Sequence, residues 1–271
     1  MMTALPVSPS LIGAVIFVFG AIVGSFLNVC IVRLPKDESV VHPPSHCPQC
    51  GAGIPFYDNI PLISYVLLLG RCRSCGERIS ARYFLVELLM AALAVSLYYE
   101  FGLGLAFVVS FVFVAALIVV SFIDLDVRII PDEISLSGIV LGLLFSIIAR
   151  YLINDPFEVI PSPLSSLLGV LIGGGFLLAV GWAYEACTGI EGMGGGDVKL
   201  FAMIGAFLGA QSLLVTLILA SLGGSAIGLT VILVKRVGRR YPIPFGPFLC
   251  LGALLYLFFG RELLQLYPLP G

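Results

Sequence analysis

Long apolar runs separated by short polar segments make up almost the whole chain and predict an all-helical protein that crosses a membrane several times. A helix needs about 20 apolar residues to cross the hydrocarbon core of a bilayer. The run 198–234 is too long for one crossing, so we divide it near Gly209 into a short helix and a longer one. We therefore expect about eight spans, at 11–32, 83–99, 103–123, 134–151, 164–186, the two parts of 198–234, and 244–259.

The composition agrees with a membrane protein. Of the 271 residues, 59% are hydrophobic and 11% are charged, whereas a soluble domain has about 25% charged residues. The net charge of −2 offers no basic surface for nucleic acid, so we expect no nucleic-acid partner. The partner that this composition does imply is the lipid bilayer.

The basic residues predict the orientation, because Lys and Arg accumulate in cytoplasmic loops. With the N-terminus outside, twelve of the fourteen basic residues lie in inner loops, and only Arg150 and Arg261 lie outside. This orientation places the polar segment 35–82 and the glycine-rich stretch 192–200 on the cytoplasmic side.

The segment 35–82, inserted after the first span, carries two C-x-x-C pairs separated by 21 residues. Two such pairs can give a tetrahedral Zn²⁺ four thiolates, and a cytoplasmic location argues against disulfides. Four thiolates leave no open position for water, so the expected zinc is structural. The predicted ligands are Cys47, Cys50, Cys72 and Cys75. His46 directly precedes the first pair and is a spare candidate ligand.

Other polar positions around this segment have more than one interpretation. The apolar stretch 60–69 is too short to span and predicts an interfacial segment. Glu87 lies about one turn inside the second span. The sequence leaves three interpretations open for it: an ion pair with Arg82, a bond to a polar group of another helix, or a role in a site. The first span ends with a face that can pack or hydrogen-bond to another helix, formed by Gly24, Ser25 and Asn28.

Two carboxylates are expected at one level of the membrane. Asp124 directly follows the third span, and Asp197 precedes the short helix of 198–234. Two carboxyls close together in a low dielectric share a proton. The charged one can take a proton from water while the neutral one donates to a carbonyl oxygen, which hydrolyses a peptide bond. Asp197 could alternatively only cap its helix. We expect Asp132, after Pro131, to be the N-cap of the fourth span.

Three glycines before Asp197 leave room for an extended peptide backbone beside the carboxylate. They are Gly194, Gly195 and Gly196.

Together these motifs resemble those of bacterial prepilin peptidases, the bifunctional type IV leader peptidases and N-methyltransferases. The resemblance runs from Gly24-Ser25-Phe26-Leu27-Asn28 through both C-x-x-C pairs and Asn59-Ile60-Pro61 to the two acid motifs. It implies that Asp124 and Asp197 are the catalytic pair of a GxGD aspartic protease. It also implies that residues 1–100 are associated with methyl transfer and residues 101–271 form the peptidase core.

The same resemblance implies the substrates and the methyl donor. Type IV prepilins and type II secretion pseudopilins are cleaved after a glycine at the cytoplasmic boundary. The new N-terminus is then methylated from S-adenosylmethionine. No G-x-G-x-x-G follows a predicted strand, so the residues that bind this cofactor are not predicted. Two other functions stay open: a transporter with an acidic ion path and a metal-sensing loop, and a non-catalytic assembly partner of a pilus machine.

Overall fold

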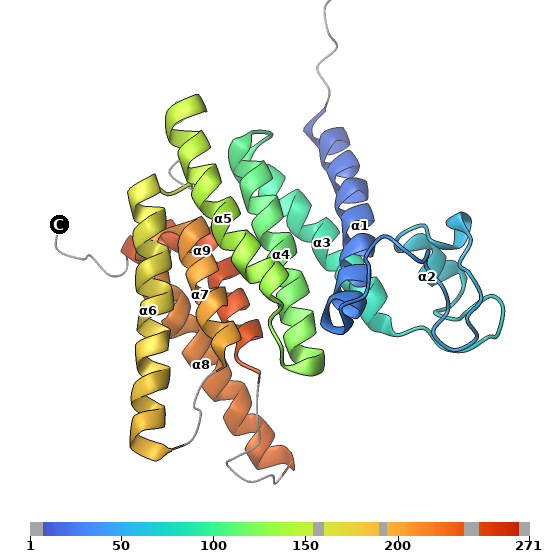
Figure 1. The fold of residues 1–271 in the computed structure, drawn as a ribbon. Helices are drawn as coiled ribbons and strands as arrows, with labels where there is room; N and C mark the ends of the chain where they lie inside the picture. Colours follow the sequence, from blue (N-terminus) through green and yellow to red (C-terminus); the bar gives the residue numbers. More distant parts are fainter. Residues whose placement is uncertain (1–7, 154–159, 190–193, 236–243, 266–271) are drawn as a thin grey trace, which may run out of the picture. The chain divides into compact units, whose positions relative to one another are not determined.

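The computed structural model describes residues 8–153, 160–189, 194–235 and 244–265, and within these residues every regular element is a helix (Figure 1). The chain divides into two compact units, Met1–Val119 and Val120–Gly271. Helix α4 (Leu105–Val127) begins in the first unit and ends in the second.

The first unit is built on two helices, α1 (Pro9–Arg33) and α3 (Ala81–Phe101). Glycines on one face of α1 let the two backbones approach closely. A Cβ on Gly20 would lie 2.8 Å from the Cα of Ala91, and one on Gly24 would lie 2.7 Å from the Cα of Glu87. Small residues are the usual means of close packing between membrane helices. The predicted packing face at Gly24 is therefore confirmed.

Between α1 and α3 lies a polar segment with little regular structure. It contains the 3₁₀ turns η1 (Leu34–Lys36) and η2 (Phe56–Asp58) and the five-residue helix α2 (Ile63–Leu67). Helix α2 is too short to span a bilayer, as expected, and exposes Ile63, Val66 and Leu67. Its location at the membrane interface stays a prediction.

The described residues of the second unit form five further helices and a π-helical turn. They are α5 (Asp132–Ile147), η3 (Ile148–Ile153), α6 (Pro163–Thr188), α7 (Gly195–Leu208), α8 (Ala210–Lys235) and α9 (Gly246–Gln265). Helix α7 is the centre of this unit and contacts α5, α6, α8 and α9. Every residue from Leu200 to Phe207 is buried. A helix that is apolar on all sides belongs inside a protein, which explains why α7 can be short.

Glycines on the surrounding helices make room for α7. Two from α5 and two from α6 recur at four-residue spacing, the small-xxx-small pattern of close helix contacts. They are Gly138, Gly142, Gly169 and Gly173. Gly169 of α6 lies against the backbone of Gly205 in α7, with no space for a side chain on either residue.

Six helices in the described part of the chain are long and apolar enough to cross a membrane, which supports a multi-pass membrane protein. They are α1, α3, α4, α5, α6 and α8. Helix α7 has only 14 residues, and the apolar part of α9, Gly246–Gly260, is also short. The division of 198–234 near Gly209 is confirmed, because Gly209 ends α7 with a φ of 79° that favours glycine.

The predicted role of Asp132 is wrong. Pro131 is the N-cap of α5, and no side chain caps this helix. Asp132 is the first helical residue, and its carboxylate bonds to Lys199 of α7 instead.

Candidate functional site

Asp124 lies in the last turn of α4 and is only 5% exposed. Its Oδ2 accepts a hydrogen bond of 3.0 Å from the backbone N–H of Gly246, the first residue of α9. The first N–H groups of a helix have no partner within the helix, so a carboxylate suits this position. A Cβ on Gly246 would lie 2.7 Å from Oδ2, so only glycine allows this approach without a shift.

Asp197 lies in the first turn of α7 and is partly exposed. The N-cap of α7 is Gly194, so the alternative that Asp197 only caps this helix is wrong. A carboxylate in the first turn is favoured by the helix dipole.

Ile130 connects the surroundings of the two acids. A Cβ on Gly196, next to Asp197, would lie 2.9 Å from the Cβ of Ile130, and one on Gly246 would lie 3.3 Å from its Cδ1. Gly246, whose N–H binds Asp124, and Gly196, the neighbour of Asp197, thus both pack against the side chain of Ile130. The structure therefore brings together the end of α4 and the first turns of α7 and α9, with both carboxyls in one region.

The three predicted glycines have different surroundings. Among the described residues, a Cβ on Gly195 would meet no atom within 4 Å, and one on Gly194 would meet only Oδ2 of Asp197, at 4.0 Å. Both glycines are exposed, whereas Gly196 packs against Ile130. The open space beside Asp197 is thus at the first two glycines. The preceding residues Gly192 and Met193 lie outside the described residues.

An ion pair joins the beginning of α7 to the beginning of α5. Lys199 Nζ lies 2.7 and 2.8 Å from the two carboxylate oxygens of Asp132. Sequence reasoning missed both this pair and the Gly246 donor. Signals for them exist in the sequence: an acid in the first turn of α5, a lysine two residues after Asp197, and a glycine between Phe245 and Pro247.

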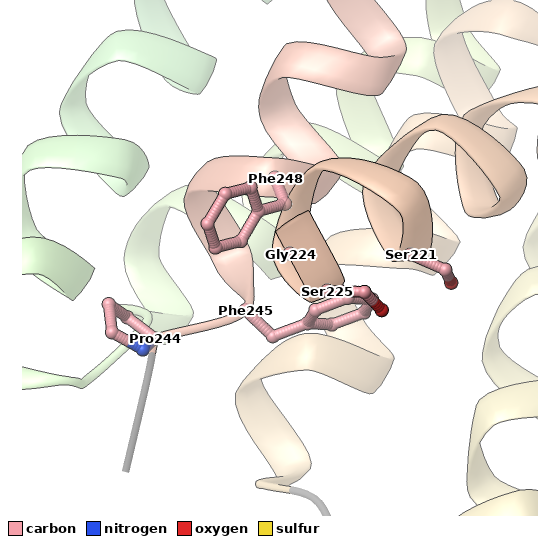
Figure 2. Close-up of a pocket in the computed structure, with 6 residues that line it drawn as sticks. All are labelled: Ser221, Gly224, Ser225, Pro244, Phe245 and Phe248. Carbon is pink, nitrogen blue, oxygen red and sulfur yellow. The ribbon is translucent and has the colours of Figure 1, made fainter. Parts of the chain in front are cut away.

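A groove of about 280 Å³ runs between α8 and the start of α9 (Figure 2). Phe245 and Phe248 supply aromatic rings, and α8 supplies small residues. The lining consists of Ser221, Gly224, Ser225, Pro244, Phe245 and Phe248. Phe245 directly precedes Gly246, so the groove begins beside the backbone group that holds Asp124.

The four predicted cysteines of the first unit form one cluster, in which all four sulfurs lie within 4.8 Å of one another. They are Cys47, Cys50, Cys72 and Cys75. Tetrahedral zinc with Zn–S bonds of about 2.3 Å requires sulfurs roughly 3.8 Å apart. The Sγ atoms of Cys47 and Cys75 are 3.9 Å apart, so the donor set fits such a metal. His46 is not in the cluster.

The two C-x-x-C pairs have the same local structure. In each, the N–H of the glycine after the second cysteine donates to the carbonyl of the first cysteine, at 2.9 Å. These glycines, Gly51 and Gly76, have φ values of 70° and 74°, which favour glycine. Backbone N–H groups of Cys75 and Ser74 lower the pKa of the Cys72 thiol to about 7. A thiolate, the form that binds metal, is thereby favoured.

An ion pair links the second cysteine pair to the rest of the segment. Arg73 donates to both carboxylate oxygens of Asp58, at 2.7 and 2.6 Å. The hydrogen bonds from Arg73 hold the pKa of the Asp58 carboxyl below its usual value.

Comparison with known proteins gives a consistent result across the chain. Residues 18–101 match the bacterial peptidase A24 N-terminal domain, and residues 111–229 match the type IV leader peptidase family. The prepilin leader peptidase/N-methyltransferase of Aeromonas hydrophila is 36% identical over 284 residues, covering 96% of this chain and 94% of the relative. The protein of the same name from Dichelobacter nodosus is 37% identical, covering 92% of each chain. No solved structure matches this chain. By its similarity to these relatives along nearly its whole length, the chain belongs to the type IV leader peptidase family.

Proposed function

We propose that this chain is an aspartic endopeptidase that removes the leader of type IV prepilins and then N-methylates the new N-terminus. The relatives named above carry both activities in their names. The observation that supports the peptidase most directly is the meeting of Asp124 and Asp197 around Ile130, beside an open, glycine-lined approach.

The proposed chemistry uses the two carboxyls as one acid–base pair. The charged carboxyl takes a proton from a water molecule, whose oxygen attacks the carbonyl carbon of the scissile peptide bond. The protonated carboxyl donates its proton to the carbonyl oxygen. Collapse of the tetrahedral intermediate then breaks the C–N bond. The departing nitrogen takes the proton that the first carboxyl removed from water, and the second carboxyl regains a proton from a hydroxyl of the intermediate. Because the pair exchanges protons as a unit, we assign neither carboxyl alone as the base.

The substrate path that we propose follows the open side of this pair. An extended backbone approaches Asp197 at Gly194 and Gly195, where no other group of the described residues fills the space. Gly196 lets Ile130 pack closely, which supports the position of Asp197. The groove at Phe245 and Phe248 receives apolar side chains next to the cleaved bond. Type II secretion pseudopilins, with the same leader and apolar helix, would bind in the same way.

The arrangement in the membrane is part of the proposal. We place the N-terminus outside and the cysteine cluster and both acids at the cytoplasmic face of the bacterial inner membrane. Helices α7 and α9 then complete eight membrane-embedded helices, with α7 shielded from lipid by its neighbours. The excess of basic residues in the inner loops supports this orientation. Several of these, at 236–240, lie outside the described residues.

We propose a division of labour between residues 1–100 and residues 101–271. The first part holds a structural Zn²⁺ at Cys47, Cys50, Cys72 and Cys75 and serves methyl transfer, and the second is the peptidase core. S-adenosylmethionine is the proposed methyl donor. The described residues form helices and two isolated bridges and include no strand–helix nucleotide fold, so no residue is assigned to the donor.

Replacing each acid by its amide tests the peptidase. Asp124→Asn and Asp197→Asn should each slow leader removal by about 100- to 10,000-fold, the usual contribution of acid–base groups. Purified variants are incubated with a prepilin, and the product N-terminus is sequenced. Glu133→Gln, an exposed acid in the first turn of α5, is the matched control and should cleave normally.

Cleavage at the wild-type rate by either amide variant would refute the assignment. Proton or cation flux through proteoliposomes, together with no cleavage by the wild type, would favour the transport alternative. A wild type with neither activity would favour the non-catalytic assembly partner.

A further inference from the structure

A second buried carboxylate lies in the first unit, where the peptidase chemistry does not use it. Glu87 is the seventh residue of α3 and is only 9% exposed. At 1.5 Å per residue it lies about 9 Å inside a helix that we treat as membrane-spanning. Ionisable groups at such positions are costly and by default mark a functional site. Its Oε2 accepts a 2.8 Å hydrogen bond from the N–H of Leu62, and the Ser25 side chain also hydrogen-bonds to the Glu87 carboxyl.

Asn28 adds an acceptor without a donor to the same helix interface. It is 3% exposed, and its Nδ2 donates to the carbonyl of Tyr83 at 2.9 Å. Its Oδ1 is buried with no hydrogen-bond partner among the described residues. A buried acceptor in this state destabilises the folded protein, because it has lost its hydrogen bonds to water and gained none. Such an atom points to a donor that is supplied from outside the chain.

The packing of α1 on α3 brings these groups close together. Gly24 lies against Glu87, and Asn28, one turn later on α1, bonds to Tyr83, one turn earlier on α3. Ser25 lies between Gly24 and Asn28 along α1. Ser25, Asn28 and Glu87 therefore project from one short stretch of the α1–α3 interface, in which each helix contributes about one turn.

The backbone that covers Glu87 is strained. Leu62 has φ 62° and ψ −49°, and the N–H of Ile63 donates to the carbonyl of Pro61 at 2.7 Å. This is the γ-turn of the rarer hand, which costs energy for any residue with a side chain. Strain of this kind persists only where the surroundings impose it, and it is frequent at ligand-binding and catalytic sites. The hydrogen bond from Leu62 to Glu87 thus holds the backbone of Leu62 in a strained turn. If another donor bound the Glu87 carboxylate, this turn could relax.

The chemistry of the cluster defines the ligand. Carboxylate, amide and hydroxyl oxygens are acceptors, and one of them carries a negative charge. A primary ammonium has three N–H donors, a positive charge and no acceptor, so it matches all three groups. The nearest cationic side chain of α3, Arg82, has its guanidinium over the ring of Tyr83, 5.6 Å from the centroid.

We propose that Glu87, with Ser25 and Asn28, binds the free N-terminal ammonium that leader removal creates, and that Glu87 accepts its proton. The inference rests on the proposed function. The ammonium replaces the N–H of Leu62 at the carboxylate and satisfies Oδ1 of Asn28. One proton moves from the nitrogen to a carboxylate oxygen of Glu87, and no other bond changes. The neutral amine that remains has the lone pair that methylation requires.

Glu87→Gln is the informative variant, because its amide oxygen still accepts the N–H of Leu62 while the charge and the proton acceptor are lost. A purely structural role of Glu87 would survive this change. Methylation of mature pilin should fall by about 100-fold or more, the usual contribution of a general base. Leader cleavage should stay within about twofold, which shows that the protein is folded. Glu100→Gln, exposed at the other end of α3, is the matched control and should methylate normally.

Binding by the full-length protein in nanodiscs provides a readout independent of turnover. The probes are the N-terminal segment of mature pilin with a free amine, the same peptide N-acetylated, and an N-acetylated leader peptide with its lysines. The wild type should prefer the free amine over the acetylated peptide by about 10-fold or more, as expected for a charge-assisted contact. Glu87→Gln should lose this preference. Ser25→Ala, which keeps the bond between Glu87 and Leu62, should weaken it by about threefold.

Several outcomes would overturn the inference. One is an unchanged preference and normal methylation in Glu87→Gln. Another is a preference for the leader lysines over the free N-terminus, which would identify a different ammonium. If the wild type itself neither cleaves nor methylates, the proposed function has failed, and the binding experiment still reports whether Glu87 recognises an ammonium.

Discussion

The polar site of the first unit and the aspartate site of the second are held in place by different kinds of interaction. Around the cysteines and Glu87, specific polar atoms fix the chain. For example, the buried Arg33 at the end of α1 donates to the carbonyls of Ser39 and Pro43, at 2.8 and 2.6 Å. Around Asp124 and Asp197, close contact of small residues fixes whole helices. The first site should therefore be sensitive to loss of ligands, and the second to added volume.

The contrast follows from the sequences of the two regions. The segment between α1 and α3 has too few apolar residues to bury a core, so a metal and hydrogen bonds must replace one. Helix α7 is apolar on every side from Leu200 to Phe207, and its neighbours approach it through glycines such as Gly142 and Gly169. Where the backbones of two helices are in contact, there is no space for an added side chain.

Removing two thiolates should have the largest effect. The double variant Cys47→Ser, Cys72→Ser should lose about one zinc per chain and become protease-sensitive within residues 35–82. Structural zinc contributes roughly 10–16 kcal/mol to the folding of small zinc domains. Metal analysis and limited proteolysis measure both changes, and leader cleavage should be affected much less. Cys187→Ser, exposed and outside the cluster, is the control. A metal-free wild type with unchanged protease resistance would contradict the structural role of zinc.

Adding one methyl group at the centre of the second unit should have the next largest effect. Gly205→Ala places a Cβ against the backbone of Gly169, and α6 and α7 must separate. Overpacking of this kind costs about 1–3 kcal/mol, so the melting temperature and the cleavage rate should both fall. In Gly175→Ala the new Cβ meets no atom of the described residues within 4 Å, and stability should be unchanged or improved. Equal stability of Gly205→Ala and Gly175→Ala would show that the close contact between Gly169 and Gly205 does not determine the stability of the second unit.

The same contrast explains what could be predicted from the sequence. Metal ligands that lie close together in the sequence can be recognised from their spacing, so the clustering of the four cysteines could be predicted. The helices follow from long apolar runs, and the end of α7 follows from Gly209. Asp124 and Asp197 stand out because carboxylates are costly at the ends of apolar segments.

Features that depend on contacts between distant segments could not be predicted in this way. The bond from the Gly246 N–H to Asp124 joins residues 122 positions apart. The pairing of Asp132 with Lys199 joins residues 67 positions apart, and the N-cap prediction for Asp132 considered only its neighbours in sequence. Glycines at four-residue spacing in α5 and α6 signal close packing, but not which helix they contact.

The ion pair of Asp132 and Lys199 is an exception to the close helix packing at the aspartate site, because it acts through charge. Its loss should have a modest effect. Lys199 and Asp132 are 38% and 53% exposed, and exposed pairs contribute about 0.2–1 kcal/mol. Lys199→Met should therefore slow leader cleavage by roughly 1.4- to 5-fold through a less well fixed first turn of α7. The exchanged pair Asp132→Lys, Lys199→Asp should recover most of the rate. High salt should slow the wild type toward the rate of Lys199→Met, because it screens exposed charges. A charge exchange without recovery would show that the two residues act separately.

The smallest effect on stability is expected at Gly195, where a methyl group meets no described atom within 4 Å. Alanine is a better helix former than glycine by about 1 kcal/mol in a helix interior, so Gly195→Ala at the start of α7 should fold at least as well as the wild type. Its KM for prepilin should nevertheless rise several-fold, because the methyl group enters the space that we assign to the substrate backbone. Gly196→Ala should behave in the opposite way and lose stability, since its Cβ would lie 2.9 Å from that of Ile130. An unchanged KM in Gly195→Ala would place the peptide elsewhere. A raised KM in a fully stable Gly195→Ala protein would show that Gly195 leaves space for the substrate, whereas Gly196 serves helix packing.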